Sequence, residues 1–231
     1  MEIQILHCLA GARQARGLAV VIDVFRAFSL ECYLASRGAR EIRPVATLEE
    51  AFAFRAKDPQ AVLVGERHGA KCEGFDFGNS PSSIPESAVR GRRVIHTTSA
   101  GTQGITAAAQ GAEEVLTGSL LNAAAIARYI RAKDPTLVSL VAMGTEAVRP
   151  NAEDELCAAY IQSLLLGAPL PDLDARLADL RYHGGEHFFN PNTQHIYPEP
   201  DFWLCAKADQ FDFILRAAYD AEGMVMQRIE A

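Results

Sequence analysis

Short apolar runs alternate with longer stretches of helical spacing along this chain. The runs are rich in Val and Ile, and the clearest of them, LAVVIDV at 18–24, predicts a strand buried on both faces of a sheet. The intervening stretches are long enough to cross between parallel strands. The predicted strands are 18–24, 41–45, 61–64, 93–97, 114–117 and 137–142, and the predicted helices are 27–36, 47–57, 102–109, 122–132, 153–166 and a short one within 169–180.

Capping and breaking residues set several of these boundaries. Thr47 and Glu50 have the spacing of a capping box, so a helix should begin there and end at Asp58-Pro59. The glycine- and proline-containing segments 65–92 and 183–200 predict long loops, and 203–216 predicts a closing helix or strand. The pattern indicates the α/β class, as a three-layer α/β/α arrangement around a mainly parallel or mixed sheet. We expect residues 1–231 to form a single domain or two closely packed lobes.

Composition and charge exclude several classes of protein. The chain has 231 residues, is 49% apolar and carries 22 Lys and Arg against 29 Asp and Glu, for a net charge of −7. An acidic chain lacks the surplus cations that a nucleic-acid backbone requires. No apolar run reaches the ~18 residues of a membrane helix, and the N-terminus does not read as a secretion signal. We therefore expect a soluble cytoplasmic protein that binds neither nucleic acid nor membrane, with its five scattered cysteines reduced and buried.

Short polar residues follow most of the predicted strands. They are Asp23 with Arg26; Gly65, Glu66 and Arg67; Thr97, Thr98 and Ser99; Gly118 and Ser119 with Asn122; and Gly144, Thr145 and Glu146. Any one of these groups could simply cap the helix that follows it. Ligands of open α/β sheets bind at the carboxyl ends of the strands, where the loops converge. The whole set therefore favours one site built from five loops.

Asp23 is the leading candidate within that set. It follows the buried run 20–22, and a carboxylate in such a place requires a metal ion or a cationic partner. Arg26 is expected either to pair with Asp23 or to bind an anion oxygen. Haloacid-dehalogenase-type phosphatases carry a second Asp where this chain has Phe25, which disfavours a covalent aspartyl-phosphate mechanism.

Three further segments suggest chemistry. The turn TTSAGT at 97–102 can direct amides and a helix dipole at an anion, and the long polar loop at 65–81 is typical of a lid or binding segment. HGGEH at 183–187 matches the pattern of inverted zinc peptidases, but that pattern requires a helix, which two adjacent glycines disfavour. The acidic run 153–155 is explained equally by a helix dipole and by metal ligation.

Taken together, these segments resemble the 2-phosphosulfolactate phosphatase (ComB-type) family, which hydrolyses a phosphate monoester in coenzyme M biosynthesis with magnesium. The resemblance covers nearly the whole chain in order. The matching stretches are VVIDVFRAFS (20–29), GERHGAKCEGFDFGNSP (65–81), TTSAGT (97–102), VLTGSLLNAAAIA (115–127), AMGTEAVRPNAEDELCA (142–158), His183-Gly184 and CAKADQFD (205–212). Phe28 and Ala100 depart from the family pattern, and Phe28 is expected to narrow the pocket. The resemblance implies a compact α/β fold, and two structurally related halves are one form that this fold could take.

The resemblance implies magnesium-dependent hydrolysis of the phosphate monoester of a small anionic hydroxy acid. Asp23, Arg26, Glu66 and Arg67 are the expected catalytic residues, and Asp23, Glu66 and Asp154 the expected Mg²⁺ ligands. The expected substrate-binding residues are Asp76, Asn79, Thr97, Thr98, Gly101, Thr102, Ser119, Asn122 and His183. The alternatives are a non-catalytic protein that binds an anionic metabolite or nucleotide, and a magnesium-dependent lyase or mutase. The sequence does not determine the oligomeric state, and a homodimer is one of the states it allows.

Overall fold

A ten-stranded mixed sheet forms the centre of the molecule, in the strand order β1-β8-β2-β7-β9-β10-β3-β6-β4-β5. The computed structural model describes residues 1–231. The strands are β1 (Glu2–His7), β2 (Gly17–Ile22), β3 (Glu41–Pro44), β4 (Val62–Arg67), β5 (Ala70–Lys71), β6 (Arg93–Thr97), β7 (Ala112–Gly118), β8 (Leu137–Ala142), β9 (Phe213–Asp220) and β10 (Gly223–Glu230). The helices are α1 (Cys8–Ala12), α2 (Ala27–Ser36), α3 (Leu48–Lys57), α4 (Glu86–Val89), α5 (Gly101–Ala108), α6 (Ala123–Lys133), α7 (Ala152–Leu166), α8 (Leu173–Asp179) and α9 (Glu199–Cys205).

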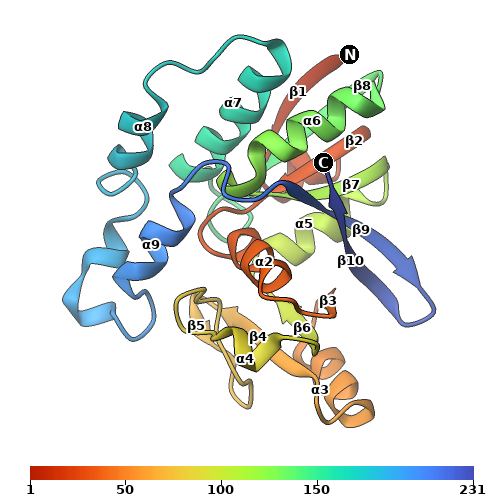
Figure 1. Ribbon diagram of the computed structural model, residues 1–231, viewed down its shortest axis with the longest axis vertical. Helices are drawn as coiled ribbons and strands as arrows, with labels where there is room; N and C mark the ends of the chain where they lie inside the picture. The colour runs from red at the N-terminus through yellow and green to blue at the C-terminus, as the bar shows by residue number, and fades with distance from the viewer.

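The sheet consists of two parallel groups joined by a C-terminal hairpin. Strands β1, β8, β2 and β7 are mutually parallel, as are β3, β6 and β4. The hairpin β9–β10 pairs antiparallel with β7 on one side and with β3 on the other. Figure 1 shows it in blue, beside the first group above and the second group below. The two parallel groups therefore run in opposite directions.

Helices cover both faces of the sheet, which confirms the three-layer prediction. Along β2, Leu18, Val20 and Ile22 pack into a core formed with α6 and α7. The alternate residues Ala19 and Val21 pack into a second core formed with α1 and α5. A strand buried on both faces is apolar throughout, and this is the pattern that made β2 the clearest strand in the sequence.

Most predicted elements agree with the structure, and the largest differences lie near the termini. The capping box is present, since Thr47 accepts from the backbone N–H of Glu50 and the Glu50 carboxylate accepts from the backbone N–H of Thr47. Strand β1, helix α1 and the β9–β10 hairpin were not predicted. The closing element expected over 203–216 is divided, because α9 ends at Cys205 and β9 begins at Phe213. The expected loops contain β5, α4 and two 3-10 turns.

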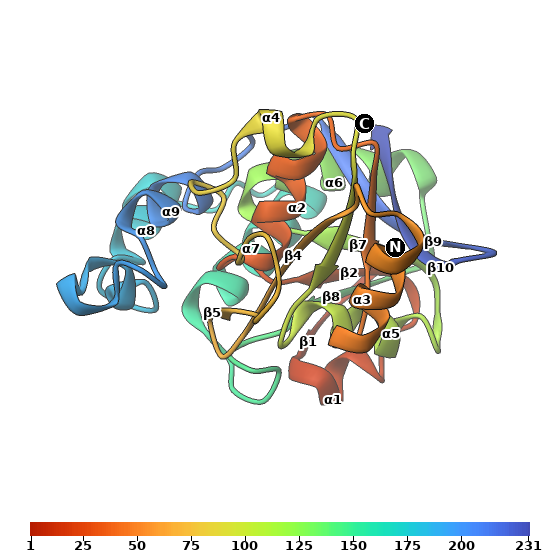
Figure 2. The ribbon, with the colours of Figure 1, turned by 90° about the horizontal axis from the view of Figure 1, so that it is seen from below.

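Residues 173–205 form a projection that covers one end of the sheet. Figures 1 and 2 both show α8 and α9 extending away from the strands. Phe188 and Phe202 anchor this segment on Phe25, with ring centroids 5.2 and 5.6 Å from the Phe25 ring. All five cysteines are unpaired and buried, as predicted. No helix has the length and apolar character needed to cross a membrane.

Candidate active site

A cavity of about 350 Å³ lies where the carboxyl ends of β2, β4, β6 and β8 meet the projecting segment. Four of the five predicted strand-end groups therefore contribute to one cavity, while the group at Ser119 and Asn122 does not line it. The lining residues are Asp23, Phe25, Arg26, Ala27, Glu66, His68, Gly69, Asn79, Thr98, Ser99, Ala100, Gly144, Thr145, Glu146, Asn151, Glu153, Gly184, His187 and Tyr197.

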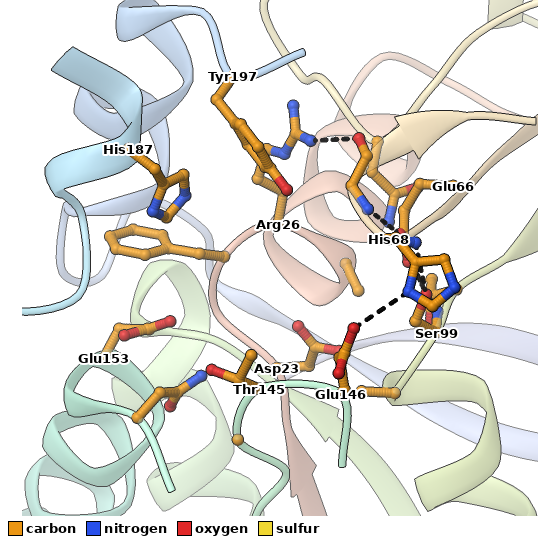
Figure 3. Close-up of a pocket in the computed structure, with 18 of the residues that line it drawn as sticks. Asp23, Arg26, Glu66, His68, Ser99, Thr145, Glu146, Glu153, His187 and Tyr197 are labelled. Carbon is orange, nitrogen blue, oxygen red and sulfur yellow. Dashed lines mark hydrogen bonds and ion pairs between the residues drawn. The ribbon is translucent and has the colours of Figure 1, made fainter. Parts of the chain in front are cut away.

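The lining carries more negative than positive charge. Its acidic residues are Asp23, Glu66, Glu146 and Glu153, whereas Arg26 is its one arginine or lysine. Figure 3 shows Asp23, Glu146 and Glu153 along the lower side of the cavity, with Arg26 and His187 above. An anionic ligand would be repelled from the lower side unless a cation accompanied it.

Asp23 and Glu153 are the two buried carboxylates that the protein leaves without adequate compensation. Burial, and then the neighbouring Asp154, raise the pKa of Asp23 well above its usual range. Burial, followed by Asp154, raises the pKa of Glu153 to about 8. Glu153 is only 5% exposed, and its Oε2 has no hydrogen-bond partner. A bound cation would compensate the negative charge of both side chains and so stabilise their ionised forms.

Glycines lie against both of these carboxylates. A Cβ atom at Gly184 would lie 2.6 Å from Glu153 Oε2, and one at Gly101 would lie 3.0 Å from Asp23 Oδ2. Gly184 also has a φ of +113°, which a side chain rarely tolerates. The space beside each carboxylate is therefore kept free by the backbone itself.

Glu66 and Asp154, two of the predicted metal ligands, already have hydrogen bonds to both carboxylate oxygens. Glu66 Oε1 accepts from the backbone N–H of Ser99 at 2.7 Å, and Oε2 accepts from the N–H of Gly69 at 2.7 Å. Asp154 accepts from the N–H groups of Val24 and Gly144, both at 2.8 Å. Burial nevertheless raises the pKa of Asp154 to about 6. These two carboxylates hold neighbouring loops in place around the cavity.

Arg26 pairs with Asp201 rather than with Asp23. Its Nη1 lies 2.9 Å from Asp201 Oδ2, and both side chains are almost fully buried. Nη2 donates to the carbonyl of Gly69 at 3.2 Å, and the guanidinium lies 4.9 Å from the Tyr197 ring centroid. Arg26 thus connects the start of α2 to the β4–β5 turn and to α9. Figure 3 shows its guanidinium beside the Tyr197 ring.

Several predicted site residues lie outside the lining. They are Arg67, Asp76, Thr97, Gly101, Thr102, Ser119, Asn122, His183 and Asp154. The Arg67 guanidinium donates to the hydroxyl of Thr97 at 2.9 Å and to backbone carbonyls, so its charge is directed away from the cavity. Asp76 forms an ion pair with Arg55.

The other residues outside the lining have local structural contacts. Ser119 and Asn122 bond each other at the turn before α6. His183 is exposed and lies 3.0 Å from Asp179, four residues earlier. Phe28 is fully buried and does not line the cavity, so the expectation that it narrows the pocket is wrong.

The loop 183–200 supplies lining residues that the sequence did not predict. Its HGGEH motif forms no regular helix, as expected, and a 3-10 turn spans Glu186–Phe189. His187 enters the cavity with its ring centroid 4.5 Å from that of Tyr197, and burial together with Arg26 lowers the pKa of His187. His68 pairs with Glu146 at 3.0 Å across the opening. Glu153, in contrast, belongs to the acidic run for which metal ligation was one of two explanations.

Comparison with known proteins identifies relatives over most of the chain. A family model described as 2-phosphosulpholactate phosphatase matches residues 6–188. A protein of Deinococcus radiodurans is 39% identical over 170 residues, which is 73% of this chain and 70% of that protein. One from Bacillus subtilis is 31% identical over 228 residues, 96% and 95% of the two chains. One from Caldicellulosiruptor saccharolyticus is 39% identical over 152 residues, 64% and 62%. Each is named "Probable 2-phosphosulfolactate phosphatase".

Proposed function

Because the chain belongs to the 2-phosphosulpholactate phosphatase family, we propose that it hydrolyses the phosphate monoester of a small anionic hydroxy acid with the help of Mg²⁺. The names of its relatives point to 2-phosphosulfolactate as the substrate, with sulfolactate and phosphate as products. The observation that carries the proposal is the pair of buried, uncompensated carboxylates, Asp23 and Glu153, beside a cavity that must accept an anion.

The donor set suits magnesium better than zinc. No group of three or more His, Cys, Asp or Glu side chains is arranged to hold a metal ion directly. Structural and catalytic zinc sites need three or four such ligands, whereas Mg²⁺ keeps several waters and takes one or two carboxylates with substrate oxygens. Asp23 and Glu153 would hold the ion, in place of the Asp23, Glu66 and Asp154 set expected from the sequence.

Bound Mg²⁺ would supply positive charge to the phosphoryl oxygens, where charge accumulates in the transition state, and would favour ionisation of a nearby water. The chain supplies hydrogen-bond donors around that position. Thr98 Oγ1 accepts from the backbone N–H of Thr102 at 3.2 Å, which leaves its hydroxyl hydrogen free for a phosphoryl oxygen. The buried Arg26–Asp201 pair holds one guanidinium in the cavity wall and prevents it from moving with the substrate.

Water is the proposed attacking group. Phe25 occupies the position where a second carboxylate would act as acid and base for an aspartyl nucleophile, and its ring packs edge-on against Phe188. Gly184, His187 and Tyr197 of the projecting segment form one wall of the cavity beside the position proposed for the phosphate. A location in the cytoplasm, a role in coenzyme M biosynthesis and a homodimer stay predictions.

Phosphate release from 2-phosphosulfolactate, measured with Mg²⁺ and with EDTA, tests the proposal. We expect turnover only with the metal, and a loss of about 100-fold or more in kcat/KM for Asp23→Asn and Glu153→Gln. Glu155→Gln, which removes a half-exposed carboxylate from the same helical turn, is the matched control and should stay within about twofold. Undiminished turnover in EDTA would exclude the metal. A product formed without phosphate would indicate a lyase or mutase, and binding without any product would indicate a non-catalytic role.

A further inference from the structure

A line of buried polar side chains leads from the core of the molecule to the cavity. Glu31 of α2, His96 of β6 and Asn79 of the loop after β5 form this line. Glu31 Oε1 lies 2.9 Å from His96 Nδ1, and His96 Nε2 lies 3.0 Å from Asn79 Oδ1. Glu31 and His96 are fully buried, whereas Asn79 is among the lining residues. The proposed reaction does not use Glu31 or His96.

The charge of this buried pair decides where its hydrogens lie. A carboxylate in the core is costly unless a cation compensates it, and no other cationic group bonds Glu31, whose second oxygen accepts only from Thr117 Oγ1 at 3.4 Å. For the pair to carry no net charge, a proton must lie between Glu31 Oε1 and His96 Nδ1 in addition to the other hydrogen of the imidazole. Whether that proton resides on Glu31 or on His96, the remaining imidazole hydrogen is at Nε2 and is donated to Asn79 Oδ1.

The orientation of the Asn79 amide follows from this hydrogen. With Oδ1 turned inward to accept from His96, the amide nitrogen Nδ2 is the atom left for the cavity, and no protein group pairs with it. An uncompensated Glu31 carboxylate with a neutral imidazole protonated at Nδ1 would instead turn the amide around and present an acceptor. An acceptor would repel the phosphoryl oxygens of the substrate.

We propose that Glu31 and His96 are positioning residues that hold Asn79 with its Nδ2 directed into the cavity, where the amide donates a hydrogen bond to a phosphoryl oxygen of the substrate. The identity of that oxygen rests on the proposed function. The orientation of the amide does not, since it follows from contacts within the protein.

Nitrogen-15 NMR of the intact protein with labelled histidine tests the orientation directly. The His96 signal, assigned by its loss in His96→Gln, should show a hydrogen on Nε2, the nitrogen that faces Asn79 Oδ1. An unprotonated Nε2 would overturn the proposal, whatever the enzyme's activity. Exposed His195 provides an internal comparison, since its ring has no protein partner to fix a tautomer.

A double-mutant cycle separates positioning from a purely structural role. Asn79→Ala should weaken the binding of inorganic phosphate, measured by calorimetry with Mg²⁺, by about ten- to hundredfold. Glu31→Met combined with His96→Leu replaces the buried pair with apolar side chains, which cores often tolerate, and releases the amide. This double variant should remain folded by circular dichroism and lose phosphate affinity to the same extent.

Adding Asn79→Ala to that double variant should then cost no more than about twofold. An undiminished effect of Asn79→Ala in that background would mean that the amide is oriented without the pair, and would refute the proposal. Phosphate binding that follows this cycle, with no phosphate release from any phosphorylated hydroxy acid, would retain the positioning role and reject the proposed reaction.

Discussion

Replacing Glu153 with Gln should stabilise the metal-free protein, and more so as the pH rises. The unfolded carboxyl ionises near its ordinary pKa of 4.5, whereas burial raises the pKa of the folded group to about 8. The folded state therefore holds a proton that the unfolded state releases. Stability from this group is present below pH 4.5 and is lost as the pH rises toward 8.

The size of the effect follows from those two pKa values. Relative to a side chain that stays neutral, ionisation of Glu153 lowers the free energy of unfolding by about 1.4 kcal/mol at pH 5.5 and by about 4 kcal/mol at pH 8. Gln cannot ionise, so the variant should gain roughly 2–3 kcal/mol over the wild type between the two pH values. For a chain of this size that corresponds to a difference in Tm of about 4–12 °C.

Thermal unfolding in EDTA at pH 5.5 and pH 8 measures this difference. Glu155→Gln is the control, because it removes a charge from the same first turn of α7, where the helix dipole acts on both carboxylates. Addition of Mg²⁺ at pH 8 should raise the Tm of the wild type and leave Glu153→Gln nearly unchanged. A Tm difference independent of pH would refute the reasoning that the buried charge of Glu153 is the source.

Two further predictions concern the cavity wall. Arg26→Ala should destabilise the protein by about 3–5 kcal/mol, because it leaves Asp201 buried without its partner. Arg67→Ala should cost only about 1 kcal/mol, because the acceptors of Arg67 are carbonyls and a hydroxyl. Denaturant unfolding compares the two variants, and equal losses of stability would contradict this reasoning. Gly184→Ala should weaken Mg²⁺ binding at least about tenfold by displacing Glu153, as measured by calorimetry, and an unchanged affinity would exclude Glu153 as a ligand.

Much of the fold could be predicted because the central strands are buried on both faces. An apolar run as short as 18–22, rich in Val and Ile, favours an interior strand over a buried helix, and the capping box at Thr47 defines a helix start by local chemistry alone. The β9–β10 hairpin was harder to predict. Burial does not alternate from residue to residue along either strand, and the hairpin pairs with β7 and β3 over only a few residues, so the two-residue period that marks a strand is missing.

The sequence located the cavity at the ends of the predicted strands, but it did not determine the role of each residue there. Asp23 and Glu66 both follow apolar runs, yet only the folded structure shows that backbone N–H groups bond both oxygens of Glu66, whereas Glu153 Oε2 has no partner. Arg26 finds its partner 175 residues away at Asp201, a distance along the chain over which a single sequence carries no signal. Tyr197, which lines the cavity against the Arg26 guanidinium, is also far from Arg26 along the chain.

The position of the last strand has a consequence for biosynthesis. Strand β10, Gly223–Glu230, lies near the middle of the sheet, and with β9 it alone connects the two parallel groups through backbone pairing. While the ribosome is still adding these residues, each group has an open edge with unsatisfied amides and carbonyls. Completion of the sheet must therefore wait until both strands of the β9–β10 hairpin have been synthesised, and until then the two parallel groups can only form separately.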